Sequence, residues 1–408
     1  MEQKTTILII FAITYLGIAM GRIPGLKLNR AGIALLGAIA MMLFGRVTTA
    51  QAVSYINWPT ICLLFGFFVI SAQLRLSGFY DVIASRLADQ LKHPARFLFI
   101  LMVTAGGLSA FLNNDVVCLV FAPVTGAALV RKNINPVPFL IALAIASNLG
   151  AAATVIGNPQ NMMISQVARL DFGSYLVWSI VPVLFAMTAA YGIIWIMSRN
   201  HLQSTTAAQS VPVEQSHPYN AIHTIKGIVI LAAVIGLFFS SLPKEIIVLA
   251  AAGIHLASTK FRTEDLLGLV DWQVLVLFVG LFVVAGSFQS AGYGLQAVHW
   301  LAAGGYNLNA PVTLVLTTAG LSNLIGNSAA VMLLLKMTDL TQHSVPYLLA
   351  LSNSFGGNLI IVGAVSNIIV AQQARERGIK IGFWDFARLG IPVTLVALAA
   401  VIVRAVLN

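Results

Sequence analysis

The chain has 408 residues, of which 59% are hydrophobic and only 9% are charged. Soluble globular proteins carry about a quarter charged residues, so this composition excludes a soluble enzyme, a disordered chain and a nucleic-acid-binding domain. The net charge of +10 comes from basic residues that lie mostly between apolar runs, as membrane topology requires. We therefore predict an all-α polytopic membrane protein whose surroundings are the lipid bilayer, with no nucleic-acid partner.

Ten apolar runs are candidates for membrane-spanning helices, which need about 20 residues to cross the hydrocarbon core. In chain order they are 5–21, 31–45, 58–74, 137–168, 176–198, 226–241, 246–258, 272–289, 345–374 and 389–407. Two further runs, 96–130 and 310–338, are interrupted by the polar sequences FLNND and LSNLIGNS. Each arm has about 13–15 residues, too few to cross comfortably, so we predict two re-entrant hairpins with tips near the midplane. An apolar stripe in 79–93, with a counterpart at 293–301, predicts either helices along the membrane surface or plain connecting helices.

A polar stretch at 199–224 divides the chain into two similar halves. Tryptophan, glycine and asparagine recur in one order at nearly one spacing: Trp58/Trp272, Gly66/Gly280, Gly150/Gly356, Gly157/Gly363 and Asn161/Asn367. We predict a first membrane repeat at 1–198, a linker at 199–224 and a second repeat at 225–408. Each repeat would hold about five transmembrane helices, one re-entrant hairpin and a broken helix. An odd number of crossings inverts the second repeat relative to the first.

The distribution of basic residues predicts the orientation. With the N-terminus outside, 17 of the 23 Lys and Arg residues fall inside and 6 fall outside. Because positive residues are retained on the cytoplasmic side, we expect both termini outside and the linker 199–224 in the cytoplasm. The expected location is a bacterial inner membrane.

Four segments carry polar groups at membrane depth, where they are tolerated only if they are buried in protein or line a wet cavity. They are the two hairpin tips and the Gly- and Pro-containing breaks at 150–161 and 356–367. Broken helices expose free N–H groups, which attract anions, and free C=O groups, which attract cations. The predicted substrate-binding residues in and around these segments are Ser147, Asn148, Thr154, Ser322, Asn323, Asn327, Ser328, Asn358, Ser366 and Asn367.

Asp115 is the one acidic residue deep within an apolar run. Burying a carboxylate there costs at least about 2.5–3.5 kcal/mol, so it requires a cation or a proton. A simple helix-capping role is the alternative, and both roles are compatible. The counterpart of Asp115 is Ser328, which places the acid on one half only. The predicted coupling-ion or proton site comprises Asn113, Asn114, Asp115, Gly157, Asn158 and Asn161.

Nothing in the sequence indicates an enzyme. The seven histidines form no pair at metal- or haem-ligand spacing, and no nucleophile with a base stands out. We expect no cofactor, and no metal beyond Na⁺ as a coupling or transported ion. Membrane receptor and intramembrane enzyme functions are therefore disfavoured.

The break GNPQN, the tip LNND followed by Pro123, and the helix starts NW and DW together resemble the ion transporter superfamily. That group includes arsenite permeases, divalent anion/sodium symporters, citrate carriers and some sodium/proton antiporters. LNND resembles the arsenite permease branch, whereas GNPQN is closer to the general anion permeases. The resemblance implies a cation or proton at the first tip and break, with substrate between both tips. It also implies alternating access against a scaffold, in a monomer or a homodimer.

Three functions remain open at this point. The first is a secondary transporter of an anion or metalloid oxyanion, coupled to H⁺ or Na⁺ by alternating access. The second is a sodium/proton antiporter, and the third is a sodium-coupled di- or tricarboxylate symporter. No Lys or Arg lies within either tip or break, so a charged substrate would rely on helix N-termini, Asn and Ser groups and a co-bound cation.

Overall fold

The computed structural model describes residues 2–20, 28–88, 91, 93–199 and 218–407, and every regular element in these ranges is a helix. The first half forms α1 (Glu2–Met20), α2 (Arg30–Leu43), α3 (Thr49–Tyr55), α4 (Trp58–Leu76), α5 (Phe79–Ala88), α6 (Pro94–Phe111), α7 (Asn114–Arg131), α8 (Val137–Ala151), α9 (Pro159–Val167) and α10 (Phe172–Ser198). The second half forms α11 (Ala221–Leu237), α12 (Lys244–Leu256), α13 (Thr263–Gly268), α14 (Trp272–Ser290), α15 (Tyr293–Ala303), α16 (Pro311–Ile325), α17 (Asn327–Leu334), α18 (Val345–Gly356), the 3₁₀ turn η2 (Ile361–Gly363), α19 (Val365–Arg375) and α20 (Phe383–Val406).

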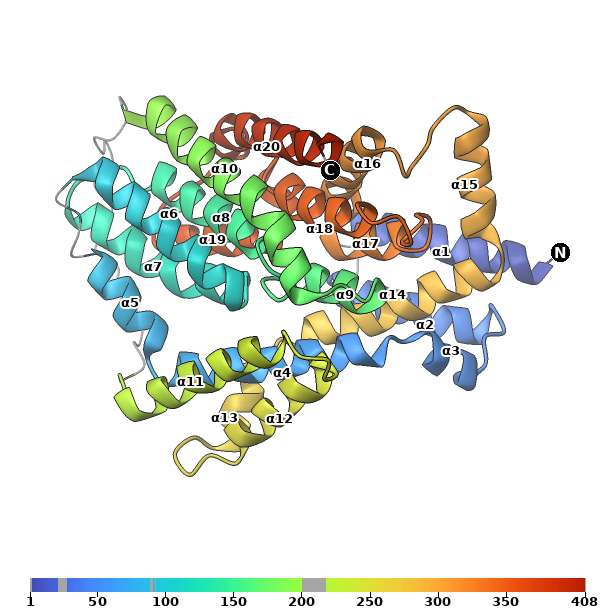
Figure 1. Ribbon diagram of the computed structural model, residues 1–408, viewed down its shortest axis with the longest axis horizontal. Coiled ribbons are helices and arrows are strands. Elements are labelled where there is room, and N and C mark those ends of the chain that lie inside the picture. Colours follow the sequence, from blue (N-terminus) through green and yellow to red (C-terminus); the bar gives the residue numbers. More distant parts are fainter. Residues whose placement is uncertain (1, 21–27, 89–90, 92, 200–217, 408) are drawn as a thin grey trace.

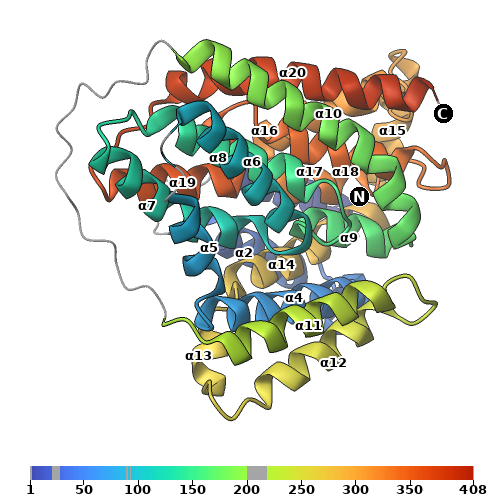
Figure 2. The same cartoon turned by 60° about the vertical axis from the view of Figure 1, so that its left-hand side comes forward.

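The two halves follow the same series of ten α-helices, so that α1 corresponds to α11 and α10 to α20. The helices α10 and α20 pack side by side and run in opposite directions (Figures 1 and 2). Opposite directions for corresponding helices are what an inverted repeat produces. The predicted fold class, an all-α membrane protein built from two inverted halves, is confirmed.

Contacts between the halves obey the same symmetry. The helix α2 packs against α14, and its counterpart α12 packs against α4. A glycine lies at each crossing: a Cβ at Gly66 would lie 2.4 Å from a methyl of Val248, and a Cβ at Gly280 would lie 2.6 Å from the backbone of Ala34. Small residues permit such close approach of helices in membranes. The matched glycines therefore mark two equivalent crossings.

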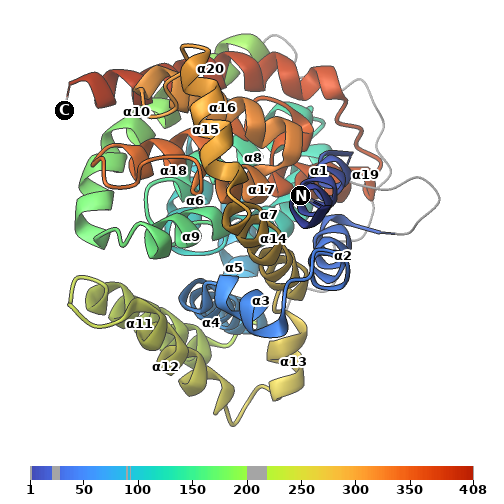
Figure 3. The same ribbon diagram turned by 90° about the vertical axis from the view of Figure 1, so that its right-hand side faces the viewer.

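The helices form two regions that are visible from several directions. In Figures 1 and 3, α4, α11, α12 and α13 make a layer beneath the bundle of hairpins and broken helices. Within the bundle, α6 packs on α8 and α16 packs on α18, each inside its own half. The second arms cross over, because α7 packs on α19 and α17 packs on α9. This exchange brings both tips and both breaks to the centre of the molecule.

Seven described helices are long and apolar enough to cross a membrane, namely α1, α4, α6, α7, α10, α14 and α20. The runs predicted at 31–45, 226–241 and 246–258 form the shorter helices α2, α11 and α12. The runs at 137–168 and 345–374 are broken where predicted, into α8 with α9 and α18 with α19.

The arms of the first hairpin differ from expectation. The helices α6 and α7 have 18 residues each, rather than about 13–15, because they extend beyond the predicted run to Pro94 and Arg131 and take in Phe111, Asn114 and Asp115 of the predicted tip. The arms of the second hairpin, α16 and α17, have 15 and 8 residues.

The remaining predictions concern the connecting segments. The short helices α3 and α13, of 7 and 6 residues, were not anticipated, because such lengths show little periodicity. Helices α5 and α15 occupy the segments expected to be amphipathic. Most of the predicted linker 199–224 lies outside the described residues.

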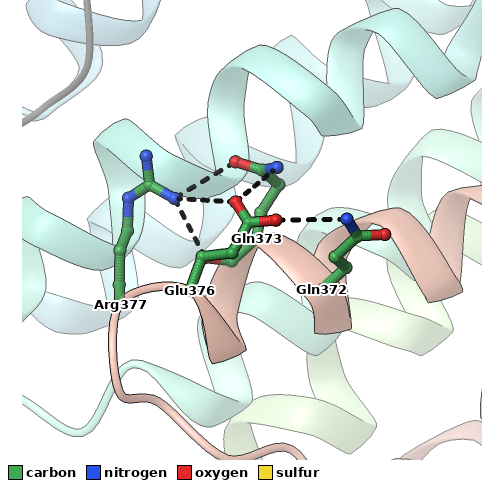
Figure 4. Close-up of polar contacts among 4 residues, drawn as sticks. All are labelled: Gln372, Gln373, Glu376 and Arg377. Carbon is green, nitrogen blue, oxygen red and sulfur yellow. Dashed lines mark hydrogen bonds and ion pairs between the residues drawn. The ribbon is translucent and has the colours of Figure 1, made fainter.

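Arg377 stabilises the C-terminal end of α19 (Figure 4). Its side chain is only 8% exposed, and Nη1 donates to the Gln373 carbonyl at 3.0 Å and to Gln373 Oε1 at 3.1 Å. Glu376 accepts from Gln372 and Gln373 at 3.1 Å and lies 4.0 Å from the guanidinium. A cation at this position satisfies helix carbonyls and interacts favourably with the helix dipole. The cluster therefore secures the second part of a broken helix that reaches the centre.

Candidate functional site

A central cavity lies where the two hairpin tips meet the two helix breaks. Its volume is about 70 Å³, and a water molecule needs about 10–15 Å³ on the same measure. The cavity therefore has room for a small ion or a few waters. Seven of the predicted site residues line it: Asn114, Asp115, Asn148, Asn158, Asn327, Ser328 and Ser366. Apolar side chains of α1 and α14, including Ile18 and Leu277, also line it.

Five α-helices begin at this cavity. The first residues of α7, α9, α17 and α19 are Asn114, Pro159, Asn327 and Val365, and α2 begins with Arg30. A helix N-terminus carries about half a positive charge and presents free N–H groups. The convergence of five such ends makes the cavity favourable for negative charge.

The helix starts in the two halves are capped differently. Asn113 Oδ1 accepts from the Asp115 N–H at 2.8 Å, and Asn158 Oδ1 accepts from the Asn161 N–H at 2.8 Å. In the second half, Gly326 and Ala364 precede α17 and α19 without a side-chain cap. Uncapped first turns leave more N–H groups for a ligand. The helix starts of the second half therefore offer the better binding site for an anion.

Asn148 is the hub of the polar network behind the cavity. Its Oδ1 accepts from Asn114 Nδ2 at 3.1 Å and from Ser366 Oγ at 2.6 Å. Its Nδ2 donates to Asn358 Oδ1 at 2.8 Å and to Asn367 Oδ1 at 2.9 Å. One amide on α8 thus joins the first hairpin tip to the second helix break. Every hydrogen-bonding position of Asn148 is used, so its side chain positions other groups.

Asn161 and Asn367 brace the two breaks in the same way. Asn161 Nδ2 donates to the carbonyls of Ala151 at 3.3 Å and Thr154 at 3.0 Å. Asn367 Nδ2 donates to the carbonyl of Gly357 at 2.8 Å and to that of Ile360 at 3.2 Å. Both asparagines are 1% exposed and lie behind the lining of the cavity. They satisfy backbone carbonyls that the interrupted helices leave open.

Other predicted site residues also support the tips and breaks from behind the cavity. Ser147 Oγ lies 2.7 Å from Ser109 Oγ and donates to the Asn114 carbonyl at 3.1 Å. Asn323 Nδ2 donates to the carbonyls of Ala319 and Gly356 at 2.8 Å.

The last four predicted residues complete this supporting layer. Thr154 Oγ1 donates to the Ala110 carbonyl, and Ser322 Oγ to that of Ala319 at 2.9 Å. Gly157 is buried against Ala151, and Asn358 is buried and accepts from Asn148 at 2.8 Å.

Asp115 lies between the central cavity and a second cavity. The second cavity is about 230 Å³ and is lined by Asn113, Asp115, Arg75 and Asp271, among other residues. The described residues offer the Asp115 carboxylate no hydrogen bond. A carboxylate without a donor requires a cation or a proton in low dielectric. Asp115 borders both cavities without a hydrogen-bond donor from the described residues.

Arg30 was not among the predicted site residues. It was assigned to the cytoplasmic charges because it directly follows a polar loop. The structure places it at the first position of α2, lining the central cavity. A Cβ built on Gly326 would lie 3.2 Å from Nη1 of Arg30, so the guanidinium lies against the second hairpin tip. Only the packing of α2 beside α14 brings this charge to the tip.

The described part of the chain contains no group of three or more His, Cys, Asp and Glu residues arranged to hold a metal ion. The oxygen-bearing side chains that share the two cavities with Asp115 are amides, serine hydroxyls and the Asp271 carboxylate. Such oxygen ligands suit Na⁺ better than a transition metal.

Comparison with known proteins identifies the family. Residues 7–347 match the citrate transporter family (CitMHS). An "uncharacterized transporter" of Mycobacterium tuberculosis is 29% identical, over 95% of this chain and 96% of its own. The silicon efflux transporter LSI3 of Oryza sativa is 25% identical over 92% of each chain, and the putative transporter arsB of Dictyostelium discoideum is 22% identical over 91% and 86%. These relatives confirm the resemblance to the ion transporter superfamily.

A solved structure shares the fold. The YdaH transporter of Alcanivorax borkumensis superposes with a TM-score of 0.60 over 99% of this chain and 97% of its own. The sequence identity is 13%.

Proposed function

This chain belongs to the citrate transporter family and is a multi-pass membrane transporter, and we propose that it moves a small anion or oxyanion coupled to H⁺ or Na⁺. Transport proceeds by alternating access of the central cavity. The proposed setting is a bacterial inner membrane, with two inverted repeats, 1–198 and 225–408, joined by a cytoplasmic linker. The functional unit is a monomer or a homodimer.

One observation carries this proposal: five helix N-termini converge on a cavity lined by a single carboxylate. The partial charges and free N–H groups attract the anion, as they do at other interrupted helices of transporters. The cavity is small, which favours a compact substrate. Relatives named for silicon efflux and as arsB support a compact oxygen-rich substrate.

Asp115 supplies the coupling. Its position between two cavities lets an ion bind from one and leave towards the other. Loading Asp115 with a proton or Na⁺ neutralises the carboxylate and so removes its repulsion of an anion in the same cavity. The predicted set Asn113, Asn114, Asp115 and Asn158 lies together at the first tip and break, which supports this assignment.

A sodium/proton antiporter is the second candidate, favoured by the unpaired Asp115 carboxylate alone. In that mechanism Asp115 alternates between Na⁺ and H⁺, and the five convergent helix N-termini bind no anion. A sodium-coupled di- or tricarboxylate symporter remains the third candidate. It requires a cavity that expands during the cycle, because about 70 Å³ is small for such a substrate.

Reconstitution into liposomes distinguishes these candidates. The purified chain is tested with an imposed H⁺ or Na⁺ gradient against arsenite, sulfate, dicarboxylates, citrate and Na⁺ alone. Gradient-driven accumulation of an anion or oxyacid supports the proposal. Exchange of Na⁺ for H⁺ without any dependence on an anion would replace it with the antiporter.

A further inference from the structure

We infer that Arg30, together with the uncapped starts of α17 and α19, forms an anion subsite that selects substrates by their negative charge. This inference rests on the proposed transport function and assigns the residue that recognises the charge. Arg30 is the basic residue that contributes to the lining of the central cavity.

The first support is the isolation of the Arg30 charge. No described carboxylate lies within 4.0 Å of its guanidinium, and no described residue makes an ion pair with it. Its side chain is half-buried. A charge withdrawn from water is costly unless it is paired. An anion entering the cavity would supply the missing partner.

The second support is the surface that faces Arg30. Gly326, at φ 84°, directly precedes α17 and has no side chain, and its ideal Cβ position lies 3.2 Å from Arg30 Nη1. The guanidinium therefore lies directly beside the free first turn of α17, and Ala364 leaves α19 equally uncapped. An oxygen of the ligand can accept from the guanidinium fork and from backbone N–H groups at once.

The third support is an unsatisfied polar atom in the same place. Asn327 Oδ1 is buried and has no hydrogen-bond partner, and Asn327 lines the cavity at the start of α17. Buried acceptors normally have a partner from protein, water or ligand. Asn327 therefore brings a polar group with an unused acceptor to the lining of the cavity.

The geometry also separates the two charges of the transport cycle. Arg30 lies against Gly326 of the second hairpin tip, whereas Asp115 belongs to the first tip. The anion and the coupling ion therefore occupy different subsites, and each can be removed by mutation without destroying the other.

The test measures binding by the purified full-length chain in detergent, using citrate, sulfate and uncharged arsenite as probes and thermal stabilisation as the readout. We expect stabilisation by sulfate, which suits the compact cavity, whereas citrate requires the cavity to expand. Arg30→Gln should raise the apparent Kd of that anion by about 10- to 100-fold, the range for a hydrogen bond to a charged group. Arg30→Lys keeps the charge without the guanidinium fork, so its apparent Kd should lie between those of the wild type and Arg30→Gln. The control Arg262→Gln removes an exposed arginine paired with Glu264 and should leave binding unchanged.

Two results would overturn the subsite: an unchanged anion Kd in Arg30→Gln, or a wild-type chain stabilised by arsenite and by neither anion. Arg30→Lys is the second variant, in case Arg30→Gln does not fold. A folded Arg30→Lys variant with wild-type affinity would contradict a bidentate contact. Liposome uptake is measured in parallel. Anion binding that depends on Arg30 without any uptake would refute the transport proposal and leave the subsite standing.

Discussion

Replacing Asn148 with alanine should destabilise the fold more than any other single change at the centre. The substitution removes four side-chain hydrogen bonds, to Asn114, Ser366, Asn358 and Asn367. Interhelical hydrogen bonds in membrane proteins average about 0.6 kcal/mol, so the four together amount to about 2–3 kcal/mol. The partners left without a bond in a buried site add to this cost.

A matched comparison exists one layer away. Ser109→Ala removes a single bond, the 2.7 Å contact with Ser147, and Ser147 keeps its bond to the Asn114 carbonyl. Its expected cost is about 0.6 kcal/mol. Unfolding in mixed detergent micelles, followed by tryptophan fluorescence, gives both free energies. If Asn148→Ala were no more destabilising than Ser109→Ala, the network would not be joining the two halves, and the hub interpretation would be wrong.

Three further predictions concern the breaks, the orientation and α19. Asn161→Ala and Asn367→Ala should each reduce transport while the protein still inserts, because two break carbonyls lose their donor in each case; two fully active variants would limit both residues to packing. A cysteine at Ser210 should resist an impermeant thiol reagent in intact cells and one at Tyr306 should react, and the reverse pattern would invert the orientation. Arg377→Ala should lower the free energy of unfolding by about 1–3 kcal/mol, because it removes the hydrogen bonds to Gln373. The same unfolding assay measures this change. An unchanged value would show that Arg377 does not stabilise the end of α19.

Most of the architecture could be predicted from the sequence, because the duplication records packing constraints twice. Gly150 and Gly356 match across the halves, and each lies where a Cβ would collide with the facing helix, at Gly106 and Ala319 respectively. Glycines fixed by close helix crossings keep their order and spacing in both repeats. The breaks were equally visible, because Asn158 and Pro159 form a recognisable helix start.

The direction of each polar side chain could not be predicted in this way. Asn161 and Asn367 were matched correctly, but their amides turn towards the break carbonyls and away from the cavity. That direction depends on the path of the backbone through the break. Arg30 was missed for a different reason: its neighbours in the sequence are loop residues, and only the crossing of α2 with α14 carries it to the second tip. Long-range contacts of this kind have no signature in a local pattern.

The measurement that tests the central claim most directly is gradient-driven uptake by liposomes containing the wild-type chain, Asp115→Asn or Asp115→Glu. Asp115→Asn keeps the size of the side chain but removes the titratable charge at the junction of the two cavities. The account predicts that the wild type accumulates its anion against a concentration gradient, that Asp115→Asn abolishes accumulation and the dependence on the coupling ion, and that Asp115→Glu retains part of both. Accumulation by Asp115→Asn at a near wild-type rate would contradict the account, because the carboxylate would then have no part in coupling, which would arise elsewhere.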